Sequence, residues 1–185
     1  MSVTVTVTPS RSVRLLARVA SALRASPAGA APPPSHPRHE DALAVLSATR
    51  GVIARGWVQN TWYVLETPAG PRPARQRFLP SRLDRSRVVG ACLVGAVMHG
   101  GWQLSPRAEY AYPAIDALWH TLFDAGAAGS ADPVGPMTPP LVRAARVRDL
   151  TTWNDRGHRA KHEVLQLLDL TIARVSSHRA AAVDA

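Results

Sequence analysis

Three segments rich in proline and glycine divide this chain of 185 residues into short stretches. They cover residues 26–39, 66–85 and 126–140. Proline lacks a backbone N–H and clashes inside a helix, and the three consecutive prolines of the first segment favour an extended polyproline conformation. Regular elements should therefore end at these segments, so the chain must build its core from the short stretches between them.

The composition excludes several classes of protein. Hydrophobic residues make up 46% of the chain, there is a single cysteine, and no apolar run reaches about 18 residues. A wholly disordered chain, a disulfide-built miniprotein and a polytopic membrane protein are therefore excluded. We predict a flexible basic arm over residues 1–39, one helical domain over 40–178 and a tail over 179–185.

Hydrophobic periodicity predicts a mostly α fold. In the first helix, Leu43, Leu46, Ile53 and Trp57 form one apolar stripe, and Gly56 suits its C-terminal cap. The expected helices of the domain cover residues 40–56, 86–99, 112–125, 141–148 and 159–178. Residues 58–65 are rich in β-forming side chains and suit a short strand or hairpin arm. The predicted fold is a single small domain of four or five helices, with room for one short β-hairpin.

The chain is strongly basic, with a net charge of +9 and a pI near 11.3. Lys161 is its only lysine, so nearly all of the basic charge is arginine, a bias that a GC-rich genome produces without functional selection. Residues 1–24 and 72–87 are rich in arginine and could attract nucleic acid. The aromatic and basic residues that would form a base-stacking surface are Trp57, Trp62, Tyr63, Trp102, Arg72, Arg75, Arg77, Arg82, Arg85 and Arg87. Core packing explains these aromatic residues equally well.

Cys92 lies among small residues, in the stretch from Gly90 to Ala96. Such a stretch suggests a helix face that approaches another backbone closely, and we expect it to pack against the last helix. Cys92 is then a small buried hydrophobe. The functional alternative makes Cys92 a nucleophile that is activated by a histidine such as His158 and oriented through Asp155. No nucleophile signature surrounds it, so the structural interpretation is favoured.

His158 and His162 have the i, i+4 spacing that zinc-binding helices use. A zincin helix needs glutamate after the first histidine, and that position holds Arg159. The third metal ligand would have to come from Asp155, Cys92, His99 or His120. We therefore favour solvated histidines and expect neither a metal nor an organic cofactor.

The sequence Trp153-Asn154-Asp155 precedes the predicted last helix. Asn and Asp are strong N-caps, and Trp153 could pack back on that helix as an apolar staple. The alternative is a polar pair that lines a pocket. We also predict a small pocket or packing site where the segments of Trp57, Cys92 with Gly95, and Trp153 meet.

Three motifs in this order resemble a family of small actinobacterial and actinophage proteins known only as a domain of unknown function. They are Gly56-Trp57, Cys92-x-x-Gly95-Ala96 and Trp153-Asn154-Asp155, the last followed by Val164-Leu165-x-Leu167-Leu168. The resemblance covers about residues 40–178 and implies no activity and no site residues. This chain departs from the pattern at Arg156, His158 and Ala160, where a Thr-capped turn is expected, and its 66–85 loop is expanded.

The sequence therefore favours a non-enzymatic accessory or interaction protein of the bacterial cytosol, with a protein partner. Phosphate-binding glycine loops, dinucleotide fingerprints, nucleophile elbows and Cys-x-x-Cys pairs are absent from it. The apolar stretch from Val13 to Leu23 is broken by Arg14 and Arg18, which does not suit a secretory signal. The alternatives are a small cysteine-dependent enzyme using Cys92, a histidine and Asp155, and a basic nucleic-acid-binding protein.

Overall fold

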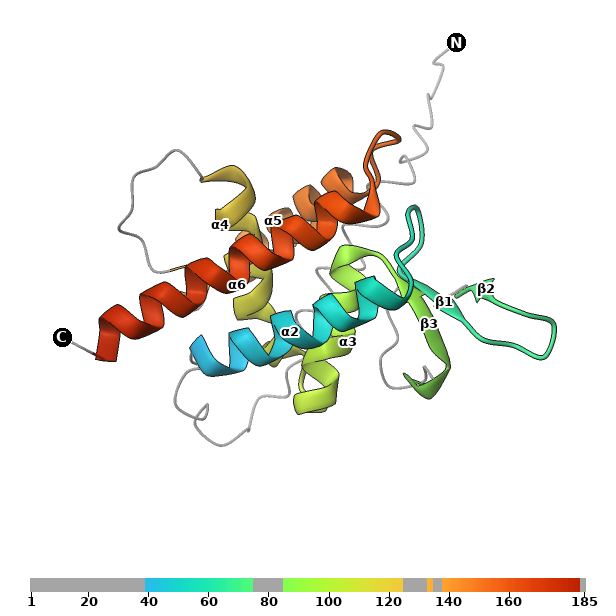
Figure 1. Ribbon diagram of the computed structural model, residues 1–185, viewed down its shortest axis with the longest axis horizontal. Helices are drawn as coiled ribbons and strands as arrows, with labels where there is room; N and C mark the ends of the chain where they lie inside the picture. Colours follow the sequence, from blue (N-terminus) through green and yellow to red (C-terminus); the bar gives the residue numbers. More distant parts are fainter. Residues whose placement is uncertain (1–38, 75–84, 125–132, 135–137, 184–185) are drawn as a thin grey trace, which may run out of the picture.

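Five α-helices and a small sheet form the part of the chain that the computed structural model describes, which is residues 39–74, 85–124, 133–134 and 138–183 (Figure 1). The helices are α2 (His39–Arg55), α3 (Leu93–Leu104), α4 (Tyr112–Phe123), α5 (Pro140–Asn154) and α6 (Lys161–Val183). The strands are β1 (Tyr63–Leu65), β2 (Arg72–Pro73) and β3 (Val88–Ala91), and two 3₁₀ turns are η2 (Arg85–Arg87) and η3 (Ala108–Ala111). The predicted mostly α domain is confirmed, whereas the basic arm lies outside the described residues.

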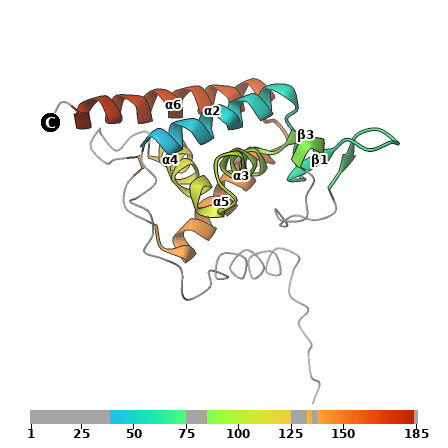
Figure 2. The same cartoon turned by 90° about the horizontal axis from the view of Figure 1, so that it is seen from below.

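Helices α2 and α6 lie side by side and run in opposite directions (Figure 2). The ion pair of Glu40 with Arg179 joins the start of α2 to the end of α6, at 3.0 Å. Arg50 pairs with Asp169 further along, at 2.5 Å. The residues that α2 buries recur at helical spacing and are Ala42, Val45, Leu46, Thr49, Val52 and Ile53. The helix predicted over 40–56 is therefore confirmed.

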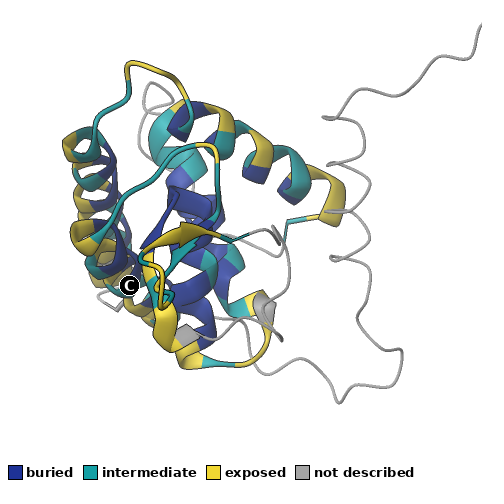
Figure 3. Ribbon diagram, turned by 90° about the vertical axis from the view of Figure 1, so that its right-hand side faces the viewer, coloured by how far each residue is buried: buried dark blue, intermediate teal, exposed yellow. Residues whose placement is uncertain are grey.

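Helix α3 lies at the centre of the domain, and most of its residues are buried (Figure 3). Its small residues do not pack against the last helix, so that expectation was wrong. Gly100 instead lies against Val45 and Thr49 of α2, and Gly101 lies against Ala111 of η3. The apolar pattern correctly marked a close-packed helix, but it contains no information about which neighbour that helix contacts.

The three strands form an antiparallel sheet in the order β2-β1-β3. In β3, Ala91 pairs with Tyr63 and Gly90 with Val64. The helix predicted over 86–99 was therefore wrong in its first half, because residues 88–91 are extended and the helix begins only at Leu93. The β-branched pair Val88-Val89 suits a strand, and pairing with β1 stabilises it there. β2 also places a short strand inside the predicted 66–85 loop.

Helices α4 and α5 run in parallel, although they follow one another along the chain. Tyr112 contacts Arg143, Asp116 contacts Arg146, and Trp119 contacts Asp149, so the register advances in the same direction on both helices. The helix predicted over 112–125 is confirmed and ends at Phe123. The short helix predicted over 141–148 is longer and covers residues 140–154.

Trp153-Asn154-Asp155 closes α5 and does not cap the last helix, which corrects the predicted role of this motif. Asp155 is the C-cap residue of α5, and its N–H donates to the carbonyl of Thr151. α6 begins at Lys161, and its first turn is held by Glu163, whose carboxylate accepts the N–H of Ala160 at 2.7 Å. α6 also continues beyond the predicted end at residue 178.

Candidate functional site

The side chain of Asn154 joins three distant segments of the chain at the end of α5. Asn154 is fully buried. Its Oδ1 accepts hydrogen bonds from Trp57 Nε1 at 2.8 Å and from the backbone N–H of Leu93 at 3.1 Å. Its Nδ2 donates to the carbonyl of Val58 at 3.3 Å and to Asp155 Oδ1 at 2.7 Å. All four hydrogen-bonding positions of this amide are therefore used. We call these five residues the Asn154 junction.

Two further residues clamp the segment after α2 onto the turn after α5. Gln59 Nε2 donates to the carbonyls of Asn154 and Arg156, both at 2.8 Å. The backbone N–H of Asn60 donates to Asp155 Oδ1 at 3.0 Å. Asn60 has φ of 60°, a left-handed conformation that asparagine tolerates better than most residues. The segment 57–60 is thus held in one conformation from both sides.

Cys92 is the N-cap residue of α3. Its Sγ accepts the N–H of Gly95 at 3.3 Å, and its own N–H donates to the carbonyl of Trp62 at 3.1 Å. The thiol is buried, and burial raises its pKa to about 12, with a smaller contribution from the negative charge of Asp155. At pH 7 a thiol with that pKa is almost entirely protonated, and the thiolate is the reactive form.

Gly95 permits the backbone of α3 to approach the segment before β1. A Cβ at this position would lie 2.3 Å from the carbonyl oxygen of Trp62, much closer than atoms can approach. The glycine therefore allows the same carbonyl to bond Cys92. Within the Cys92-x-x-Gly95 motif, one residue caps the helix and the other makes room for its neighbour.

The structure brings together the three motifs that the sequence singled out. Trp57, the start of α3 after Cys92, and Asn154 with Asp155 all meet at the Asn154 junction, at the position where a small pocket was predicted. Trp153 is buried, and the Arg159 guanidinium lies 4.0 Å from the centre of its ring. The asparagine amide links the segments at this meeting point through its hydrogen bonds.

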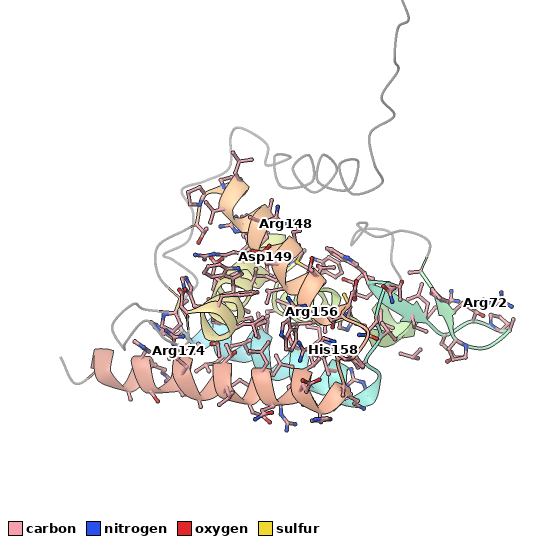
Figure 4. The ribbon with its side chains drawn as sticks, turned by 90° about the horizontal axis from the view of Figure 1, so that it is seen from above. Arg72, Arg148, Asp149, Arg156, His158 and Arg174 are labelled. Atoms are coloured by element: carbon pink, nitrogen blue, oxygen red, sulfur yellow. The ribbon has the colours of Figure 1, made fainter. Side chains whose placement is uncertain are left out.

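The histidines that were considered as metal ligands are not among the residues of this junction. His158 is exposed in the turn between α5 and α6 (Figure 4), and His162 is exposed in the first turn of α6. His99 is buried in α3, and His120 contacts the carboxylate of Asp124. Among the described residues, no group of three His, Cys, Asp or Glu is placed to hold a metal ion.

The aromatic and basic residues of the nucleic-acid hypothesis are dispersed. Tyr63 and Trp102 are buried in the core, with ring centres 6.2 Å apart. Arg87 donates two hydrogen bonds to the carbonyl of Glu66. Arg72 is exposed near the far end of the β1–β2 hairpin (Figure 4). Residues 1–24 and Arg75, Arg77 and Arg82 lie outside the described part of the chain.

A second polar site lies between α4 and α5, and the sequence analysis did not predict it. Arg146 Nη1 lies 2.8 Å from Asp116 Oδ1 and 3.2 Å from Thr138 Oγ1, and Thr138 Oγ1 donates to Asp116 Oδ2 at 2.7 Å. Arg143 Nη2 donates to the carbonyl of Thr138 at 2.9 Å. We call Asp116, Thr138, Arg143 and Arg146 the arginine cluster.

Aromatic rings support both guanidinium groups of the arginine cluster. The Arg143 guanidinium lies 3.9 Å from the centre of the Tyr112 ring, and that of Arg146 lies 4.9 Å from the centre of the Trp119 ring. Burial lowers the pKa of Arg143 and raises that of Tyr112. A sequence signal did exist, because Arg143 falls on the same face of α5 as Val147 and Leu150, where a core residue is expected.

Residues 37–174 match the model of a family of unknown function, DUF6197, over nearly the whole region in which the sequence resembles such a family. No curated protein and no solved structure matches the chain. In the described residues, no helix is long and apolar enough to cross a membrane.

Proposed function

We propose that this chain, which belongs to the DUF6197 family of unknown function, is a non-enzymatic interaction module that binds a protein partner. The observation that carries the proposal is the use of the motif residues inside the fold. The amide of Asn154 is fully hydrogen-bonded, and the thiol of Cys92 caps a helix. The Asn154 amide and the Cys92 thiol therefore stabilise the domain. We expect the residues that carry its function to lie on its surface.

The start of α5 supplies a candidate surface for such a partner. Leu141 is 79% exposed and Val142 is 44% exposed, although both are apolar. They are adjacent, and they directly precede Arg143 along the helix. Arginine is enriched at protein interfaces, and the burial of exposed apolar side chains on binding releases water from their surface.

Affinity capture with the tagged full-length chain from host lysate, with and without nuclease, tests this function. We expect a protein partner that survives nuclease, is lost with the double variant Leu141→Asp/Val142→Asp, and is retained with Leu170→Asp. Leu170 is a matched control because it is 56% exposed on a different helix, α6. A partner lost only on nuclease treatment would favour nucleic-acid binding instead, and capture unaffected by the double variant would contradict this surface.

The basic arm is a second element of the proposal. The predicted arm covers residues 1–39, but His39 is the first residue of α2, so the deletion ends at residue 38. Deletion of residues 1–38 should leave the thermal unfolding of the domain unchanged and weaken partner capture, since an arm of this composition can order on a partner. A large loss of thermal stability on deletion would show that the arm belongs to the core and would contradict this role.

The cysteine-enzyme alternative has a direct test of its own. An enzyme that uses Cys92 with a histidine and Asp155 requires a thiol that reacts in the folded state. The buried, protonated thiol of this structure favours the structural role. Rapid and selective alkylation of Cys92 in the native chain at neutral pH would favour the enzyme.

A further inference from the structure

The arginine cluster carries one more positive charge than negative charge. Arg143 is 7% exposed, and the side chain of Arg146 is 14% exposed, yet among the described residues Asp116 is the one carboxylate that faces them. The nearby Asp149 is ion-paired with Arg148 of its own helix, which Figure 4 shows beside it on α5. A buried charge without a counterion is costly, because it loses its hydration and gains no partner.

The hydrogen bonding of the cluster is also incomplete. Among the described residues, the buried Nε atoms of Arg143 and Arg146 have no hydrogen-bond partner, whereas Asp116 Oδ1 is ion-paired with Arg146 Nη1 at 2.8 Å. Buried polar groups in folded proteins are almost always hydrogen-bonded, so two such N–H groups in one cluster require an explanation.

One edge of the Arg146 guanidinium group has no hydrogen-bond partner among the described residues, and the Nε atom on this edge is buried. Its Nη1 faces Asp116 and Thr138, whereas Nε and Nη2, which share the opposite edge, make no hydrogen bond with the described residues. Two parallel N–H groups on one edge match the two oxygens of a carboxylate. The Arg146 guanidinium lies over the Trp119 ring.

Arg143 adds a second charge at the same place. Both guanidinium groups contact Thr138, Arg143 through its carbonyl and Arg146 through its hydroxyl, so the two cations converge on one residue. Thr138 directly precedes Pro139, the N-cap of α5, and this helix start has no side-chain cap. The positive end of the helix dipole therefore adds to the two cations.

We propose that Arg146 and Arg143 bind a carboxylate group at the start of α5. A carboxylate carries the single negative charge that the cluster lacks, whereas a phosphate dianion would reverse the imbalance beside Asp116. The inference deepens the proposed function, because the carboxylate that the site takes in the cell is an acidic side chain or the C-terminus of the protein partner that covers Leu141 and Val142.

Side-chain NMR of the full-length chain labelled with ¹⁵N-arginine tests the site without a partner. Sodium acetate is titrated against sodium chloride at equal ionic strength, and the Nε–H signals of Arg143 and Arg146 are followed. We expect a saturable shift with acetate and none with chloride. No acetate-specific shift of either signal would overturn the carboxylate site and would leave the interaction module itself untouched.

Matched variants locate the binding. Arg146→Lys keeps the charge but removes the two-donor edge, so acetate affinity should fall about tenfold or more. Arg148→Lys is the control, because Arg148 lies on the same helix and, within the described part of the chain, hydrogen-bonds only to Asp149. Equal affinity in the two variants would overturn the assignment. Arg143→Lys, which leaves the Arg146 edge intact, should have the smaller effect of the two cluster variants.

Affinity capture decides whether the carboxylate belongs to the protein partner or to a free small carboxylic acid. If a partner supplies it, Arg146→Lys should lose the partner and Arg148→Lys should retain it. A chain that binds acetate at Arg146 but captures its partner equally well with Arg146→Lys would show a site for a free small carboxylic acid. That result would overturn the link to the partner.

Discussion

The buried polar groups at the two ends of α5 differ in how completely they are hydrogen-bonded. At its C-terminal end, the Asn154 amide makes all four hydrogen bonds it is capable of making. At its N-terminal end, two arginines face one carboxylate among the described residues, and neither of their Nε–H groups has a hydrogen-bond partner there. A fully satisfied buried network fixes a structure, whereas an incomplete one costs stability. The first end therefore stabilises the fold, and we propose that the second is kept for binding.

The strongest way to break this comparison is to remove the amide of Asn154. Asn154→Ala leaves the Trp57 indole N–H, the Leu93 N–H and the Val58 carbonyl without their partner. We expect a loss of about 3–4 kcal/mol in the free energy of unfolding, measured in urea. Thr152→Ala, at an exposed position of the same helix, should change it by less than about 0.5 kcal/mol. A loss of less than about 1 kcal/mol in the free energy of unfolding for Asn154→Ala would contradict the difference between the two ends of α5.

A methyl group added at Gly95 tests whether α3 requires a glycine where its backbone meets the Trp62 carbonyl. Gly95→Ala places a Cβ against the Trp62 carbonyl, and we expect a loss of about 1–3 kcal/mol as the backbones separate. Gly51→Ala in α2 is the matched control, since the nearest atom to its Cβ is the end of the Arg55 side chain at 3.7 Å. That substitution should stabilise the chain by about 0.5–1 kcal/mol. Effects of the same sign would contradict the role of Gly95.

The pH dependence of stability tests the burial of Cys92. The folded thiol has a pKa of about 12, above the ordinary value of 9.0, so the unfolded chain ionises first as the pH rises. The contribution of the buried Cys92 thiol to the free energy of unfolding is complete below pH 9. It is lost between about pH 9 and 12, at up to about 1.4 kcal/mol per pH unit. Urea unfolding of the wild type between pH 8 and 10 should therefore lose more stability than that of Cys92→Ala. Parallel pH profiles of the two chains would contradict a buried thiol.

The smallest change in stability is expected for a substitution of Arg143, at the N-terminal end of α5. Arg143→Met removes the excess charge and one unpaired donor while keeping most of the side-chain volume. Its free energy of unfolding should stay within about 1 kcal/mol of the wild type, although Arg143 is as buried as a core residue. Thermal and urea unfolding would detect a difference of that size. A loss above about 3 kcal/mol would show that Arg143 stabilises the fold and would contradict its assignment to binding.

The local pattern of the sequence predicted the helices well where the apolar stripe decides the structure. α2 and α4 follow from the spacing of their buried residues, and both begin within one residue of the expected position. The prediction failed where distant contacts decide. Residues 88–91 become a strand because β1 lies beside them, and β1 precedes them by more than twenty residues.

The candidate sites show the same limit. The order of the three motifs indicated that Trp57, Cys92 and Asn154 belong together, but Asn154 was assigned to capping, a role that local preference supports. Its actual partners lie 61 and 97 residues away, and no local preference contains them. The arginine cluster was not predicted because arginine is abundant in this chain and its count gave no reason to single out Arg143 and Arg146.

The most direct test of the account is the reactivity of Cys92 in the native full-length chain. Iodoacetamide modification is followed by mass spectrometry at pH 7.5, in buffer and in unfolding concentrations of urea. The account predicts no modification of the folded chain on the timescale in which the unfolded chain reacts completely, since the thiol is buried and protonated at the start of α3. Modification in buffer as fast as in urea would contradict it, because the motif residues would then be available for chemistry.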